Sequence, residues 1–162
     1  MKYIIISIFT IGLFACNRQA GNSQSLQIQI DSLQNKLDHT YKPGFGEFMS
    51  SIQTHHAKLW FAGQNQNWEL ADFEINEIKE SLAGIKEYCS DRPETKSIGM
   101  IDLAMDSMSI AIQQKSVTQF QSGYILLTNT CNSCHQATNH EFNVIKIPDN
   151  PPFSNQDFKV KK

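Results

Sequence analysis

Hydrophobic residues recur every three or four positions through most of this chain, which is the pattern of amphipathic α-helices. Four such runs follow one another at 45–62, 68–89, 94–113 and 116–138, separated by short polar or proline-containing segments. Helices of this length with short connections are expected to pack as antiparallel neighbours. The pattern therefore predicts an all-α protein whose domain, 43–142, is an antiparallel four-helix bundle.

An extra helix is predicted at 26–42, ahead of these four. Its apolar stripe has steps of four, three and four residues, at Leu26, Ile30, Leu33 and Leu37. This stripe is shorter than the three or four heptads of a coiled coil. Two roles stay open for it, namely docking on the domain or pairing with a partner, which includes a homodimer.

The N-terminal segment 1–15 has the pattern of a bacterial lipoprotein signal peptide. Lys2 precedes an apolar run that ends next to Cys16, the residue that would carry the lipid. The run is shorter than the roughly 20 residues that span a bilayer. We expect an exported protein held by its lipid in the periplasm or cell envelope, with 16–25 as a polar tether. The alternatives are an ordinary signal peptide or an N-terminal anchor, with Cys16 incidental.

The C-terminal segment 143–162 loses the helical period and contains Pro148, Pro151 and Pro152. It is expected to be an irregular tail, either wrapped over the edge of a site or disordered. The net charge of the whole chain is −2, and no Lys/Arg-rich face accompanies the helices. Nucleic acid is therefore not an expected partner.

The sequence Cys131-Asn132-Ser133-Cys134-His135 has the C-x-x-C-H form that attaches a c-type haem. Both cysteines would form thioethers to the haem vinyl groups, and His135 would be the proximal axial ligand of the iron. The cysteines also continue the apolar stripe of the last helix, so a single haem c would lie against the core. Export fits this interpretation, because covalent haem is assembled outside the cytoplasmic membrane.

Other interpretations of the motif also stay open. Export permits a Cys131–Cys134 disulfide or a thiol-redox pair, and the chain would then be a non-haem lipoprotein interaction module. Zinc fits poorly, since it prefers four N or S ligands and no second C-x-x-C is present. Cys89 lies on the stripe of its own helix and is expected to be a buried apolar residue.

Four helices with C-x-x-C-H on the last one resemble the class II c-type cytochromes, the family of cytochrome c-prime. That resemblance implies a distal side formed by the first helix of the bundle, 45–62, either without a ligand or with a methionine. At helical pitch, Met49 and His56 both lie on the inner face of that run, which makes them alternative distal ligands. They are seven residues apart, about 10 Å along the axis, so both cannot bind one iron.

Two functions follow from the two states of the distal side. A sixth ligand such as His56 would saturate the iron and leave one-electron transfer with an unknown redox protein, which is the favoured function. An empty distal side would let the iron bind or scavenge nitric oxide or carbon monoxide. The chain has no nucleophile–base pair and no phosphate loop, so it is not expected to be an enzyme, although peroxidase-like activity stays open for an exposed haem.

Overall fold

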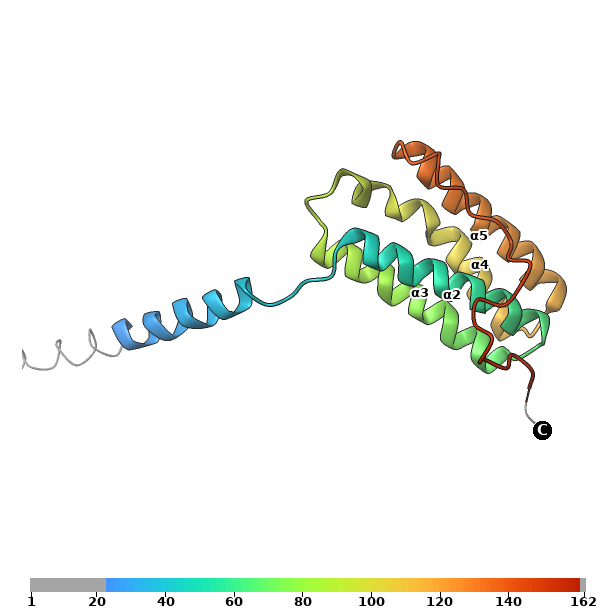
Figure 1. Ribbon diagram of the computed structural model, residues 1–162, viewed down its shortest axis with the longest axis horizontal. Helices are drawn as coiled ribbons and strands as arrows, with labels where there is room; N and C mark the ends of the chain where they lie inside the picture. Colours follow the sequence, from blue (N-terminus) through green and yellow to red (C-terminus); the bar gives the residue numbers. More distant parts are fainter. Residues whose placement is uncertain (1–22, 161–162) are drawn as a thin grey trace, which may run out of the picture. The chain divides into compact units, whose positions relative to one another are not determined.

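The computed structural model describes residues 23–160 and divides the chain after Lys42 into two units (Figure 1). In the first unit a helix covers residues 23–38, and its large apolar side chains are exposed: Leu26, Ile28, Ile30, Leu33 and Leu37. The predictions for Cys16 and for 1–15 lie outside the described residues. No described helix is long and apolar enough to cross a membrane.

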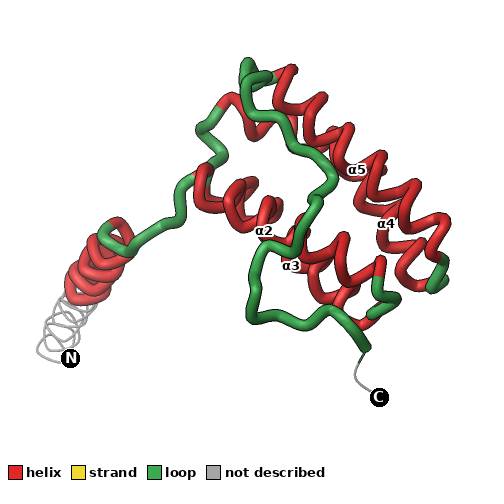
Figure 2. The backbone as a smooth tube through the Cα atoms, turned by 45° about the vertical axis from the view of Figure 1, so that its right-hand side comes forward, coloured by secondary structure: helices red, strands yellow, loops and turns green. Residues whose placement is uncertain are grey.

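The second unit, which begins at Pro43, is built from helices and loops. Its elements are α2 (Phe45–Gln64), α3 (Trp68–Tyr88), the 3₁₀ helix η1 (Pro93–Ile101), α4 (Asp102–Gln113) and α5 (Val117–Ala137). Helix α2 packs along α3, and α4 packs along α5 (Figures 1 and 2). Across residues 23–160 no strand is present, so the all-α prediction is confirmed.

Two helix starts carry the side-chain caps that the sequence predicts. The Asn67 side chain accepts a hydrogen bond from the backbone N–H of Leu70 at 3.2 Å, at the start of α3. Ser116 accepts one from the N–H of Gln119 at 3.4 Å, at the start of α5. Each cap satisfies one of the backbone donors left free in a first helical turn.

The run predicted as one helix at 94–113 is divided in the structure. Pro93 opens the 3₁₀ helix η1, and the α-helical pattern begins only at Asp102. Thr95, Ser97 and Gly99 fall within η1, and all three residue types have weaker α-helical propensity than alanine. The apolar residues of this run still face the core, since Ile98 and Ile101 are both buried.

A close contact between α2 and α5 organises the core. A Cβ on Gly63 of α2 would lie 2.1 Å from the ring of Phe120, so only glycine allows this approach. Phe120 and Tyr124 are fully buried, and the Trp60 ring lies 4.8 Å from the Tyr124 ring. The apolar stripes of the other helices are buried around them, at Ile75, Ile78, Ile85, Met105, Met108 and Leu127 among others.

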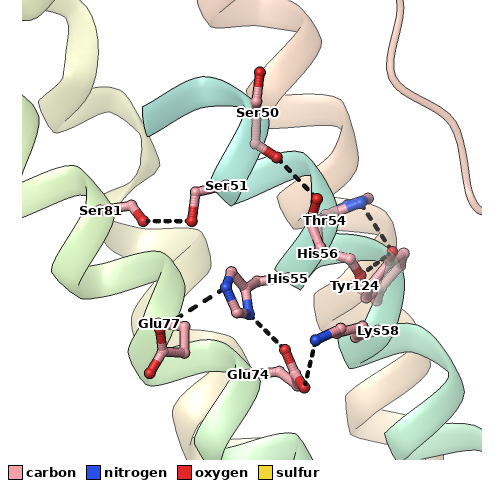
Figure 3. Close-up of polar contacts among 10 residues, drawn as sticks. All are labelled: Ser50, Ser51, Thr54, His55, His56, Lys58, Glu74, Glu77, Ser81 and Tyr124. Carbon is pink, nitrogen blue, oxygen red and sulfur yellow. Dashed lines mark hydrogen bonds and ion pairs between the residues drawn. The ribbon is translucent and has the colours of Figure 1, made fainter. Parts of the chain in front are cut away.

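Glu74 of α3 is buried, although acidic residues of an amphipathic helix are usually expected on its solvated face. Its side chain is completely buried, and its Oε2 atom lies 2.6 Å from Nδ1 of His55 on α2 (Figure 3). Lys58 Nζ lies 4.0 Å from the other carboxylate oxygen. The difference arises because α2 covers this edge of α3 and supplies the polar partners for the carboxylate.

The tail, residues 138–160, is irregular as predicted but is attached to the helices (Figure 2). Phe158 is 5% exposed and its ring lies 5.7 Å from that of Phe61 on α2. Its backbone carbonyl accepts a hydrogen bond from the Asn67 side chain at 3.3 Å. The disordered alternative therefore does not describe residues 143–160.

Candidate functional site

A cavity of about 370 Å³ lies between α2, η1, α5 and the tail. Its volume falls in the range of small-molecule sites, about 300–1,000 Å³. Much of its wall is apolar, with side chains from three helices and the tail: Phe45, Met49, Ile52, Leu82, Ile98, Ile101 and Ile145. Such a wall can hold a flat apolar group and exclude water from it.

Both motif cysteines line this cavity from α5. Burial raises the pKa of the Cys131 thiol to about 12, and burial also raises the pKa of Cys134. Both thiols are therefore protonated near neutral pH. Reactive thiol-redox pairs instead have lowered pKa values, and the described cysteines Cys89, Cys131 and Cys134 are free of disulfides. This electrostatic environment does not favour thiol–disulfide exchange.

His135 also lines the cavity, and one of its ring nitrogens is held in place. Nδ1 lies 2.6 Å from the backbone carbonyl of Asn143 in the tail. A carbonyl can only accept, so Nδ1 carries the proton and donates it. The geometry leaves Nε2 as the nitrogen that can bind a metal, which is the usual arrangement for a ligating histidine.

His56 lies on the inner face of α2, as its helical position predicts, and is only 4% exposed. Its Nε2 lies 3.0 Å from Oγ1 of Thr128, and its Nδ1 lies 3.0 Å from the Tyr124 hydroxyl. That hydroxyl also donates to the His56 carbonyl at 2.8 Å (Figure 3). Burial lowers the pKa of His56 to about 4, so the ring is neutral near pH 7.

These contacts bear on the predicted distal role of His56. Both ring nitrogens lie 3.0 Å from hydroxyl oxygens of α5, so binding a metal would require the ring to move away from one of them. Met49 is half-buried and lines the same cavity two turns earlier on α2. The structure thus brings both alternative distal residues to the cavity of the motif, and the choice between them stays a prediction.

The partners of His56 were not recognised from the sequence. Tyr124 and Thr128 are four residues apart on α5, and Thr128 also donates to the Tyr124 carbonyl at 2.9 Å. Tyr124 falls on the apolar stripe of α5, where its hydroxyl could have signalled a buried polar partner. His140 is half-buried and also lines the cavity.

Charged side chains line the cavity beside the start of η1. Arg92 donates to both carboxylate oxygens of Glu94, at 2.9 and 3.3 Å, and its guanidinium carbon lies 5.7 Å from the centre of the Phe45 ring. The Arg92 pairing lowers the pKa of Glu94. Among the residues that line this cavity, Arg92 is the one lysine or arginine.

Comparisons with known proteins do not assign the chain to a family. No protein-family model, no curated protein and no solved structure matches the chain. Within residues 23–160, no three His, Cys, Asp or Glu side chains are grouped so as to hold a metal ion. The functional assignment therefore depends on the chemistry of the cavity.

Proposed function

We propose that this chain is an exported monohaem c-type cytochrome that transfers single electrons, with its haem domain arranged as a four-helix bundle of the class II kind. One observation carries the proposal. Cys131, Cys134 and His135 line the same cavity, and the Asn143 carbonyl orients the His135 ring with Nε2 left for iron.

The lining of the cavity suits a haem in its chemistry. Its apolar wall suits the faces of a porphyrin, and the two thiols lie one helical turn apart on the same side of α5. Arg92 supplies a positive charge for the haem carboxylates, in addition to its pairing with Glu94. Because the lining is mostly apolar, a bound haem would cover few polar groups that then lack hydrogen-bond partners.

The residues of this chain then have distinct roles. The thiols of Cys131 and Cys134 would hold a haem by adding S–H across the C=C of two vinyl groups, each forming a thioether with no other product. His135 would bind the iron through Nε2, with Asn143 holding its other nitrogen. The bound haem supplies the one-electron couple. The neighbouring side chains of α2 and η1 limit the access of water and so affect the reduction potential.

A second function, the binding of nitric oxide or carbon monoxide, is favoured by the contacts of His56. Both of its nitrogens lie 3.0 Å from a hydroxyl oxygen, of Thr128 and of Tyr124, so iron can reach neither nitrogen without displacing a hydroxyl group. If Met49 does not bind iron either, the distal position is open to small ligands.

The visible spectrum of the reduced protein, with and without carbon monoxide, tests these two functions. Electron transfer with a saturated iron predicts a low-spin spectrum that carbon monoxide does not change. The variant that removes the sixth ligand, His56→Ala or Met49→Leu, should then become high-spin, with His39→Ala as an exposed control. If carbon monoxide shifts the wild-type spectrum at once, gas binding replaces electron transfer as the proposed function.

A further inference from the structure

The amide side chain of Asn132, between the two motif cysteines, binds the tail through two hydrogen bonds. Its Nδ2 donates to the Ile145 carbonyl at 2.8 Å, and its Oδ1 accepts from the Ile145 N–H at 2.8 Å. One side chain thus satisfies both backbone groups of one tail residue. This paired geometry fixes Ile145 against α5 more firmly than a single hydrogen bond would.

The tail residue that orients His135 lies two positions before Ile145. The carbonyl of Asn143 accepts from Nδ1 of His135 at 2.6 Å, and the N–H of Asn143 donates to the His140 carbonyl at 2.9 Å. The N–H of His140 in turn donates to the His135 carbonyl at 2.7 Å. Residues 135–145 therefore form a short loop fixed at one end by α5 and at the other by Asn132.

Packing contributes little to the position of Asn143 itself. Its two neighbours, Phe142 and Val144, are 80% and 71% exposed. The first inward side chain after them is that of Ile145, which lines the cavity. Besides the hydrogen bond from the Asn143 N–H to His140, the hydrogen bonds of Asn132 to Ile145 are thus the nearest restraint on the carbonyl that holds the axial histidine.

We infer that Asn132 is a positioning residue for His135, acting through Ile145 and Asn143 of the tail. The inference rests on the proposed haem function. A hydrogen bond from Nδ1–H to a carbonyl makes Nε2 a stronger donor to iron, which stabilises the oxidised state. Loss of the Asn132 side chain frees Ile145 and lengthens the hydrogen bond between His135 Nδ1 and the Asn143 carbonyl. Nε2 then becomes a weaker donor to iron, so the reduction potential of the iron rises.

The test compares Asn132→Ala with Asn129→Ala, an exposed asparagine one turn earlier on α5. Haem content is measured first, from the absorbance of the pyridine complex, and then the midpoint potential of each haem-loaded protein. Loss of a direct outer partner of a metal ligand changes metal affinity or activity about 10–100-fold, and Asn132 acts further out, through Ile145 and Asn143, so the low end of that range applies. We expect the reduction equilibrium of Asn132→Ala to rise about tenfold, which is about 59 mV for one electron, with Asn129→Ala unchanged.

A third variant and a second measurement keep the result decisive. Asn132→Asp keeps the acceptor for the Ile145 N–H and loses the donor, so exchange of the Ile145 amide should be slower in it than in Asn132→Ala; its potential is not compared, because the added negative charge lowers the potential by itself. Hydrogen exchange at the Ile145 amide should be faster in Asn132→Ala. Haem-loaded Asn132→Ala with the wild-type potential would overturn this inference alone, whereas wild-type protein without haem would overturn the proposed function as well.

Discussion

Arg92 is the residue that places a positive charge at the lining of the cavity. It is paired with Glu94 and lies over the Phe45 ring, so its guanidinium is held beside the cavity lining. A positive charge near a haem favours the reduced iron, because reduction lowers the positive charge of the metal. Arg92 should therefore contribute to the reduction potential without binding iron.

Replacing Arg92 tests this contribution. Arg92→Gln should lower the midpoint potential, and the shift should shrink as salt is added, since the screening length falls to about 10 Å at 0.1 M. Lys96→Gln is the matched control, because it removes the same charge four residues later, within η1, at an exposed residue that does not line the cavity. Redox titration of both variants gives the comparison, and equal shifts would contradict a specific role for Arg92.

At the scale of elements, the interface of α2 and α3 carries a buried charge that does not belong to the cavity. Glu74 of α3 has one carboxylate oxygen 2.6 Å from His55, and its other oxygen has no hydrogen-bond partner. His55 also lies 3.8 Å from Glu77 (Figure 3). The buried Glu74 carboxylate therefore depends on α2, which supplies the hydrogen bond from His55 and the charge of Lys58, 4.0 Å from Oε1, because a buried carboxylate without partners is costly.

Removing one partner and then both should give opposite results. His55→Leu should lower the free energy of unfolding by about 3 kcal/mol, the low end of the range for a broken buried pair, because it removes the hydrogen-bonded partner of the buried Glu74 and leaves Lys58, 4.0 Å away, as its remaining charged partner. The double change His55→Leu/Glu74→Leu should recover most of that loss. Urea unfolding of both variants measures the difference, with Glu80→Leu as an exposed control on α3. A double variant as unstable as His55→Leu would show that the carboxylate is not the cause.

Helical periodicity was enough to predict α2, α3 and α5 and the inward positions of Met49 and His56. It did not predict the burial of Glu74, which lies three residues after Ala71 and therefore at the edge of the stripe. The charge of Glu74 suggested a solvent-exposed side chain. Its burial is explained only by the position of His55 on α2. The 3₁₀ geometry of η1 was also missed, because apolar spacing alone does not distinguish it from an α-helix over so few turns.

Considering the whole molecule, the motif could be read from sequence, whereas the contacts that support it could not. Asn132 and Asn143 are separated by a helix end and a turn, and the contacts of His56 with α5 join residues about seventy positions apart. No local pattern encodes such pairs, because they depend on how the elements pack. The tail illustrates this, since its prolines predicted irregular structure but not its attachment to Asn132 and Asn67.

The central claim is that a haem is bonded to Cys131 and Cys134, and the most direct measurement is haem content after denaturation. The protein is produced with a c-type haem maturation system, and its intact mass and pyridine-complex spectrum are recorded. We predict one haem per chain in wild type and in Cys89→Ala, and none retained in Cys131→Ala/Cys134→Ala. Colourless wild-type protein, or haem that survives the double replacement, would contradict the account.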